Sequence, residues 1–118
     1  MAVFLTVCLV VTVLVIGYLA SLFWTDPERG LRETTHHARL LPSVMADRYL
    51  AYAVLGVGMI FLGSPGIIAV YFLAGAIMGL GDGYIYARAD LPHLRHTASG
   101  LASLGAMLIA LVVAASGG

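Results

Sequence analysis

The fold can be inferred most directly from residues 67–88, IIAVYFLAGAIMGLGDGYIYAR. It is apolar and long enough for a helix to cross a bilayer. Its second half carries one carboxylate, Asp82. Burying an ionised carboxylate in hydrocarbon costs about 2.5 kcal/mol or more, so Asp82 is expected to face protein and to have a partner there. The question for the rest of the chain is therefore which residues face Asp82.

Composition places the chain among integral membrane proteins. Of its 118 residues, 61% are hydrophobic and only 10% are charged, whereas a soluble domain carries about a quarter charged residues. The formal net charge is zero, which argues against nucleic acid as a partner. Cys8 is the single cysteine; it cannot form an internal disulfide and is expected to pack as a small apolar side chain.

Four apolar segments predict an all-α, integral membrane four-helix bundle that forms one domain over residues 1–118. The expected spans are residues 2–24, 43–62, 65–88 and 96–115. The short turn at residues 63–66, GSPG, joins spans two and three into an antiparallel hairpin. The expected partner of these spans is the lipid bilayer.

The connection at residues 25–42 is more polar and has two readings. Asp26 followed by Pro27 is typical of a helix N-cap with proline at the first position. A short interfacial helix would then place Leu31, Thr35, Ala38 and Leu41 near one face. A solvated loop is the alternative, favoured by Gly30.

Small residues recur at four-residue spacing in the last two spans. Gly75, Gly79 and Gly83 predict close helix packing beside Asp82. In the fourth span a run of alanines predicts a continuous packing groove: Ala98, Ala102, Ala106, Ala110 and Ala114.

The arginines predict the orientation. All six lie in or beside the first and third connections, at positions 29, 32, 39, 48, 88 and 95. By the positive-inside rule these connections are cytoplasmic, so both termini lie outside the cytoplasm in a multi-pass protein of the inner or plasma membrane. The one-sided distribution argues against a dual-topology small multidrug exporter.

A set of polar side chains is expected around Asp82. Arg48 opens the antiparallel neighbouring span at a similar height, so an Arg48–Asp82 ion pair is predicted. Tyr52 and Tyr86 each lie one helical turn from a member of this pair and are expected to offer hydroxyl donors, and His96 opens the fourth span. We expect these five residues to form a pocket open to the cytoplasm.

Two functions are compatible with this set. In the first, the pocket binds a lipophilic small molecule and, if the protein is an enzyme, isomerises or cyclises it with Asp82 as acid or base. In the second, the protein is a structural or accessory membrane subunit that assembles through its glycine and alanine seams, with itself or a larger complex, and the ion pair only joins two helices. The identity of the ligand and the oligomeric state stay open.

Histidines provide a further alternative. His93 and His96 are three residues apart, and His36 and His37 lie in the first connection on the same predicted side. Four histidines on one side are compatible with a metal or haem site. Neighbouring histidines point apart on a helix and Pro92 disturbs the start of the other pair, so the main prediction includes no cofactor and no metal.

Three short motifs carry a resemblance to a known family. They are Asp47-Arg48-Tyr49-Leu50-Ala51 at the start of span two, Gly81-Asp82-Gly83 late in span three, and His96 at the start of span four. In this order they resemble a family of small four-helix membrane proteins of bacteria and fungi, classed as a domain of unknown function. The resemblance covers about residues 40–105. It implies a four-helix bundle and supports Arg48, Asp82 and His96 as a set, but it implies no activity.

Overall fold

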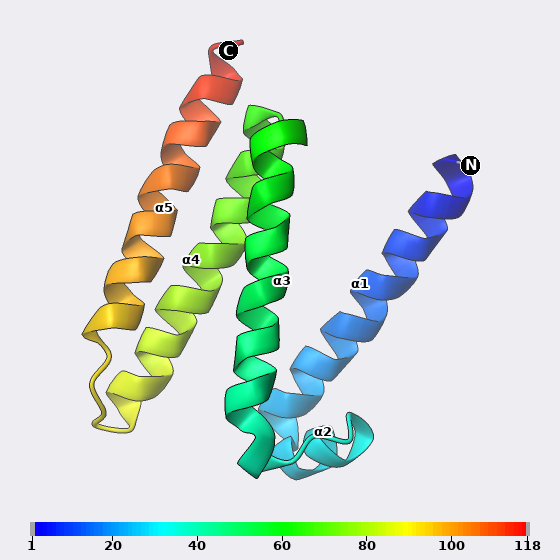
Figure 1. The fold of residues 1–118 in the computed structure, drawn as a ribbon, viewed down its shortest axis with the longest axis vertical. Coiled ribbons are helices and arrows are strands. Elements are labelled where there is room, and N and C mark those ends of the chain that lie inside the picture. The colour runs from blue at the N-terminus through cyan, green and yellow to red at the C-terminus, as the bar shows by residue number, and fades with distance from the viewer. Residues whose placement is uncertain (1, 118) are drawn as a thin grey trace. The chain divides into compact units, whose positions relative to one another are not determined.

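The protein is described by a computed structural model that covers residues 2–117, apart from the side chains of residues 2, 5, 6, 8 and 9, so the expectation for Cys8 lies outside the described part. In chain order the elements are α1 (Ala2–Thr25), α2 (Pro27–Glu33), the 3-10 helix η1 (Ala38–Leu40), α3 (Leu41–Leu62), α4 (Pro65–Arg88) and α5 (Leu94–Ala115) (Figure 1). All regular structure in residues 2–117 is helical, which confirms the all-α prediction.

Three helical segments are long and apolar enough to cross a membrane: Ala38–Leu62, Pro65–Arg88 and Leu94–Ala115. In α1 the fully described apolar segment, Val10–Thr25, is shorter. The surfaces of these helices are apolar; Phe61, for example, is 78% exposed and Leu62 is 85% exposed. Contiguous apolar surface of this kind is typical of a face covered by lipid or by protein. A fourth span in α1 stays a prediction.

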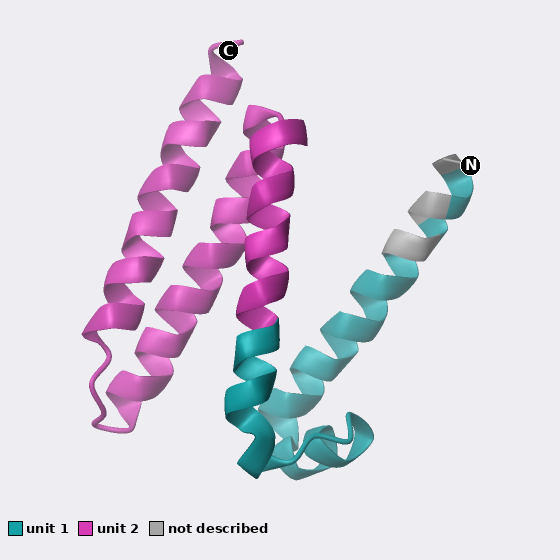
Figure 2. Ribbon diagram, in the orientation of Figure 1, with its two compact units in different colours: residues 1–47 teal, residues 48–118 magenta. Residues whose placement is uncertain are grey.

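The chain forms two compact units, residues 1–47 and residues 48–118 (Figure 2). The first contains α1, α2, η1 and the first turns of α3. The second contains the rest of α3 together with α4 and α5. Every residue of the predicted pocket belongs to the second unit.

In the first unit, α2 packs against α1. The N-cap predicted for Asp26 is present, because its side chain accepts a hydrogen bond from the Arg29 amide and Pro27 occupies the first turn. Gly30 is buried against the ring of Phe23, and a Cβ there would come within 2.9 Å of that ring. Glycine therefore allows the close packing of α2, although Gly30 was the residue that favoured the loop alternative.

The predicted interfacial helix is shorter than expected. It ends at Glu33, and Thr35 has a positive φ of 57°. A separate 3-10 turn, Ala38–Leu40, then leads directly into α3, which begins at Leu41. The single apolar face expected over Leu31, Thr35, Ala38 and Leu41 does not form, because the left-handed residue interrupts the helix.

In the second unit, α3 and α4 form the predicted hairpin. Only Gly63 and Ser64 separate them, with Pro65 in the first turn of α4. A Cβ at Gly63 would lie 2.6 Å from the Met59 carbonyl oxygen, so this tight turn requires glycine. Ser64 holds the N-cap position, but its side chain makes no capping hydrogen bond.

Helix α5 begins two residues before residue 96, the predicted start of the fourth span. Asp90 has a positive φ of 55° and lies in the turn. The N-cap of α5 is His93, without a side-chain capping bond, and the helix begins at Leu94. His96 therefore lies in the first turn of α5 and faces α4.

The glycines of α4 form a close contact with α5, as predicted. Gly75, Gly79 and Gly83 are all buried. A Cβ at Gly79 would lie 2.5 Å from the Gly100 Cα, and one at Gly83 would lie 2.5 Å from the Thr97 hydroxyl oxygen. The two backbones thus approach too closely for any side chain at the crossing point.

The five alanines predicted to form one packing groove on α5 do not all pack against α4. Ala98, Ala102 and Ala114 are exposed, Ala106 is half-buried and only Ala110 is buried. Residues at four-residue spacing advance about 40° around a helix at each step, so five of them wrap around about 160°. The face that meets α4 instead follows Gly100, Ser103 and Ala110.

Candidate functional site

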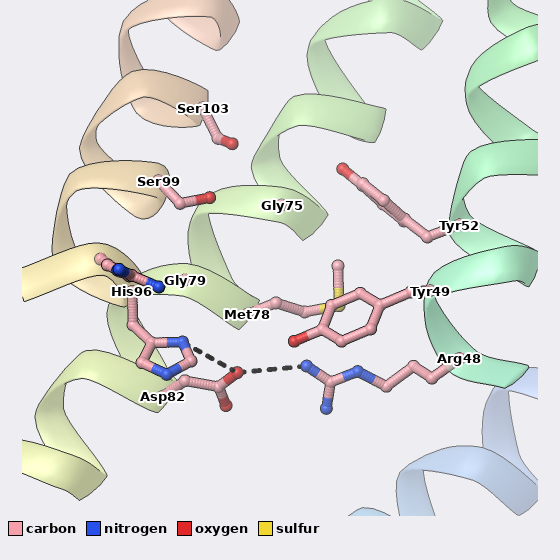
Figure 3. A pocket seen from close by; sticks show the side chains of 11 residues that line it. Arg48, Tyr49, Tyr52, Gly75, Met78, Gly79, Asp82, His96, Ser99 and Ser103 are labelled. Carbon is pink, nitrogen blue, oxygen red and sulfur yellow. Dashed lines mark hydrogen bonds and ion pairs between the residues drawn. The ribbon is translucent and has the colours of Figure 1, made fainter. Parts of the chain in front are cut away.

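A cavity of about 280 Å³ lies between α3, α4 and α5, at the end of the second unit where α4 turns into α5. We call it the polar cavity. Its lining comes from all three helices: Arg48, Tyr49 and Tyr52 of α3, Gly75, Met78, Gly79 and Asp82 of α4, and Arg95, His96, Ser99 and Ser103 of α5 (Figure 3). Gly75 leaves room for the Tyr52 and Ser103 hydroxyls, because a Cβ there would lie 2.6 Å from the first oxygen and 3.0 Å from the second.

The predicted ion pair is present at the mouth of the polar cavity. Arg48 Nη2 donates to Asp82 Oδ2 at 3.2 Å (Figure 3). The two side chains are 39% and 25% exposed. The Arg48 guanidinium also lies 5.5 Å from the centre of the Tyr49 ring, on the neighbouring residue. Asp82 therefore faces the hairpin partner, as the cost of exposing a charge to hydrocarbon predicts.

His96 approaches the same carboxylate oxygen from the other side. Its Nδ1 lies 4.0 Å from Asp82 Oδ2, too far for a direct hydrogen bond. Its ring stacks on Tyr86, with centres 4.8 Å apart and planes 8° from parallel. Tyr86 itself does not line the cavity. Its role in this arrangement is to hold the imidazole in place, which differs from the hydroxyl donor expected from sequence.

Tyr52 lines the cavity, but its hydroxyl proton is already donated in a hydrogen bond within the protein. It donates to the Tyr71 main-chain oxygen at 2.8 Å, while the Tyr71 hydroxyl donates to the Tyr52 main-chain oxygen at 3.2 Å. The two rings stack with centres 4.4 Å apart. Tyr52 can thus offer a bound molecule only an acceptor lone pair, so the predicted donor role does not fit this geometry.

Four polar side chains outside the predicted set of five also line the cavity: Tyr49, Arg95, Ser99 and Ser103. Figure 3 shows the Tyr49 hydroxyl directed from α3 across the cavity, and the two serine hydroxyls directed into it from α5. None of the four side chains has a hydrogen bond to another described residue. The only sequence signal was spacing: Ser99 is three residues after His96 and Ser103 is seven.

The histidines do not assemble into a metal site within the described part of the chain. His36 Nδ1 lies 2.7 Å from the Thr34 hydroxyl, and His93 Nδ1 lies 3.2 Å from the Thr97 hydroxyl. In residues 2–117, leaving aside the undescribed side chains, no three metal-ligating side chains converge. His37 and His36 border a separate, largely apolar cavity of about 260 Å³ in the first unit.

Comparison with known proteins finds no relative. No protein-family model matches the chain, and neither the curated proteins nor the solved structures include a significant match. The function is therefore inferred from the geometry of the polar cavity.

Proposed function

We propose that this chain is a multi-pass membrane protein whose polar cavity binds a lipophilic small molecule. The observation that carries the proposal is the convergence of Arg48, Asp82 and His96, from three different helices, on a hollow between apolar helix surfaces. Small-molecule sites are typically concave and apolar with a few convergent polar groups. The same three residues carry the resemblance to the small four-helix membrane family, so we propose membership of that family.

In the membrane we propose four spans, with α1 as the first, both termini outside the cytoplasm and the mouth of the polar cavity on the cytoplasmic side of an inner or plasma membrane. The arginine distribution supports this orientation. Arg88 and Arg95 flank the α4–α5 connection near the cavity mouth. A ligand can then enter from the headgroup region while its apolar part stays in hydrocarbon.

We also propose an acid–base reaction, isomerisation or cyclisation, as the activity of this site. Asp82 would take a proton from one ligand atom, and an N–H group of His96 would give a proton to another. The proton on Asp82 would then pass to His96, whose Nδ1 lies 4.0 Å from Asp82 Oδ2, so that both groups return to their starting state. Tyr49 would donate to oxygen on which negative charge develops, since the Tyr52 proton is used elsewhere. Such a reaction moves protons within one molecule and needs no oxidant or reductant.

The test is mass spectrometry of small molecules that co-purify with the protein, for the wild type, D82N and D90N. Asp90 lies in the turn with a positive φ that asparagine also tolerates, so D90N is a matched control. We expect D82N to lose or accumulate the bound molecule while its melting temperature changes little. A wild type that carries no molecule would refute the proposal.

A structural or accessory role is the second candidate. It is favoured by the exposed Ala98 and Ala102, which leave a face of α5 open for close packing with itself or another membrane subunit. In that case the Arg48–Asp82 pair only joins α3 to α4. D82N would then lower the melting temperature without affecting any ligand.

A further inference from the structure

The charges around the polar cavity do not balance, and the excess is positive. Arg48 is paired with Asp82, whereas the second arginine of the lining, Arg95, makes no hydrogen bond or ion pair with any described residue. Even without a charge on His96, two arginines of the lining face one carboxylate. A guanidinium is charged at every physiological pH, so one positive charge near the bilayer interface is left for a ligand.

Two of the free hydrogen-bond donors of the lining lie on the same helix as Arg95. The hydroxyls of Ser99 and Ser103 point into the cavity from α5, the helix that also carries Arg95 (Figure 3). Ser99 is one helical turn after Arg95 in the sequence, which puts both on one face. A guanidinium with nearby hydroxyl donors is the group of side chains that best recognises a carboxylate or phosphate oxygen.

A second, apolar cavity begins where the polar cavity ends. It has a volume of about 300 Å³ and is lined by α3 and α4 alone, and its wall shares Tyr52 and Met78 with the polar cavity. From Met78 it extends along α4 to Ile67, a rise of about 16 Å. The flexible Met78 side chain is the only bulky α4 side chain between the two spaces.

We infer that the ligand is an amphiphile with a single negative charge: its head group binds Arg95 beside the Arg48–Asp82 pair, and its apolar chain passes Met78 into the groove between α3 and α4. This inference rests on the proposed function and names its ligand class. One negative charge is favoured over two, because a single excess guanidinium compensates one. The head group then lies at the interface and the chain in the hydrocarbon, as for any membrane amphiphile.

The experiment uses the full chain in phosphatidylcholine nanodiscs with two photoreactive probes of equal length, a diazirine dodecanoic acid and the corresponding dodecanol. Labelled residues are mapped by mass spectrometry in wild type, R95Q and R88Q. Arg88 donates to the Tyr84 hydroxyl and does not line the cavity, so R88Q removes an equivalent charge nearby. In a parallel series, unlabelled acetate is added as a competitor of the photoreactive acid.

We expect the acid to label α3 and α4 saturably around Met78, with about tenfold weaker binding in R95Q and no change in R88Q. The alcohol should bind more weakly than the acid and be insensitive to R95Q. Equal labelling by both probes would overturn the anionic class while leaving the proposed function intact. Displacement by acetate at equal concentration would overturn the amphiphile, and absence of saturable labelling by either probe would overturn the proposed function itself.

Discussion

Tyr52 and Tyr71 donate hydrogen bonds to each other's main-chain oxygens, at 2.8 and 3.2 Å, while their rings stack 4.4 Å apart. This reciprocal pair joins α3 to α4 within the apolar part of the hairpin. It also fixes the position of the Tyr52 ring in the wall of the polar cavity. Gly75 and Gly56 make room for it, since a Cβ at either would lie within 2.7 Å of a tyrosine hydroxyl oxygen.

The first prediction concerns the stability that this pair supplies. Y71F removes one of the two hydrogen bonds and is expected to lower the free energy of unfolding by about 1 kcal/mol. The ring stack remains, so ligand binding should not change. Reversible unfolding in mixed detergent micelles measures the effect. Y84F is the matched control, because the Tyr84 hydroxyl only accepts a hydrogen bond from Arg88 at the exposed end of α4. An equal loss of unfolding free energy in Y84F would contradict this prediction.

The second prediction concerns the crossing of α4 and α5. G79A places a methyl group against the Gly100 backbone and is expected to destabilise the protein by about 1–3 kcal/mol. The chain offers a control two residues away: a Cβ at Gly81 has no neighbour within 4 Å. G81A should therefore leave the melting temperature unchanged or raise it slightly. Equal melting temperatures for the two variants would show that α4 and α5 do not cross at Gly79.

The all-helical architecture was largely predictable, because helix lengths, the turn at residues 63–66 and the N-cap at Asp26 are local properties of the sequence. The Arg48–Asp82 pair was predictable too, since a two-residue turn fixes which ends of α3 and α4 are adjacent. The face of α5 that packs was not predictable from the alanine spacing. Several stripes of small residues run along this helix, and only the partner decides which stripe is buried.

The cavity was predicted in part. Asp82, Arg48 and His96 were found because a charge within a span demands a partner. The sequence did not exclude Tyr52 as a hydrogen-bond donor to a ligand. The group that accepts its hydroxyl proton, the Tyr71 main-chain oxygen, is nineteen positions away on another helix. Arg95 gave no signal of its own, since an arginine beside a span end is ordinarily an interfacial anchor.

The third prediction is a pH dependence in the first unit. The Arg29 side chain, by its hydrogen bond and charge, and then the Tyr18 hydroxyl lower the pKa of Glu33 below its usual 4.5. A lowered pKa in the folded state means that the interaction is fully present above the unfolded pKa and is lost as the pH falls through the folded value. Amide hydrogen exchange in α2, once corrected for intrinsic exchange, should therefore accelerate as the pH falls below 4.5 and through the lowered pKa of Glu33.

The matched variant for this prediction is R29Q, which removes the partner that contributes most. Its α2 amides should exchange faster than those of the wild type at neutral pH and show less change on acidification. If α2 amide exchange responds to acidification in the same way in the wild type and in R29Q, the ion pair does not stabilise α2.

The fourth prediction is the orientation of the spans. In a C8S background, single cysteines at Ser64 and at Thr35 are expected to react oppositely with a membrane-impermeant maleimide in intact cells. Ser64, in the α3–α4 turn, should be labelled from outside, and Thr35, in the arginine-rich connection, only after permeabilisation. Labelling of Thr35 in intact cells would reverse the orientation.

The most direct measurement is an experimental structure of the protein in lipid nanodiscs at a resolution that shows side chains. We expect the Arg48 guanidinium to contact the Asp82 carboxylate, His96 to lie on the other side of that carboxylate, and density for a bound molecule to lie between Arg95 and Met78. Asp82 turned toward acyl chains, or Arg48 at the opposite membrane surface, would contradict this expectation.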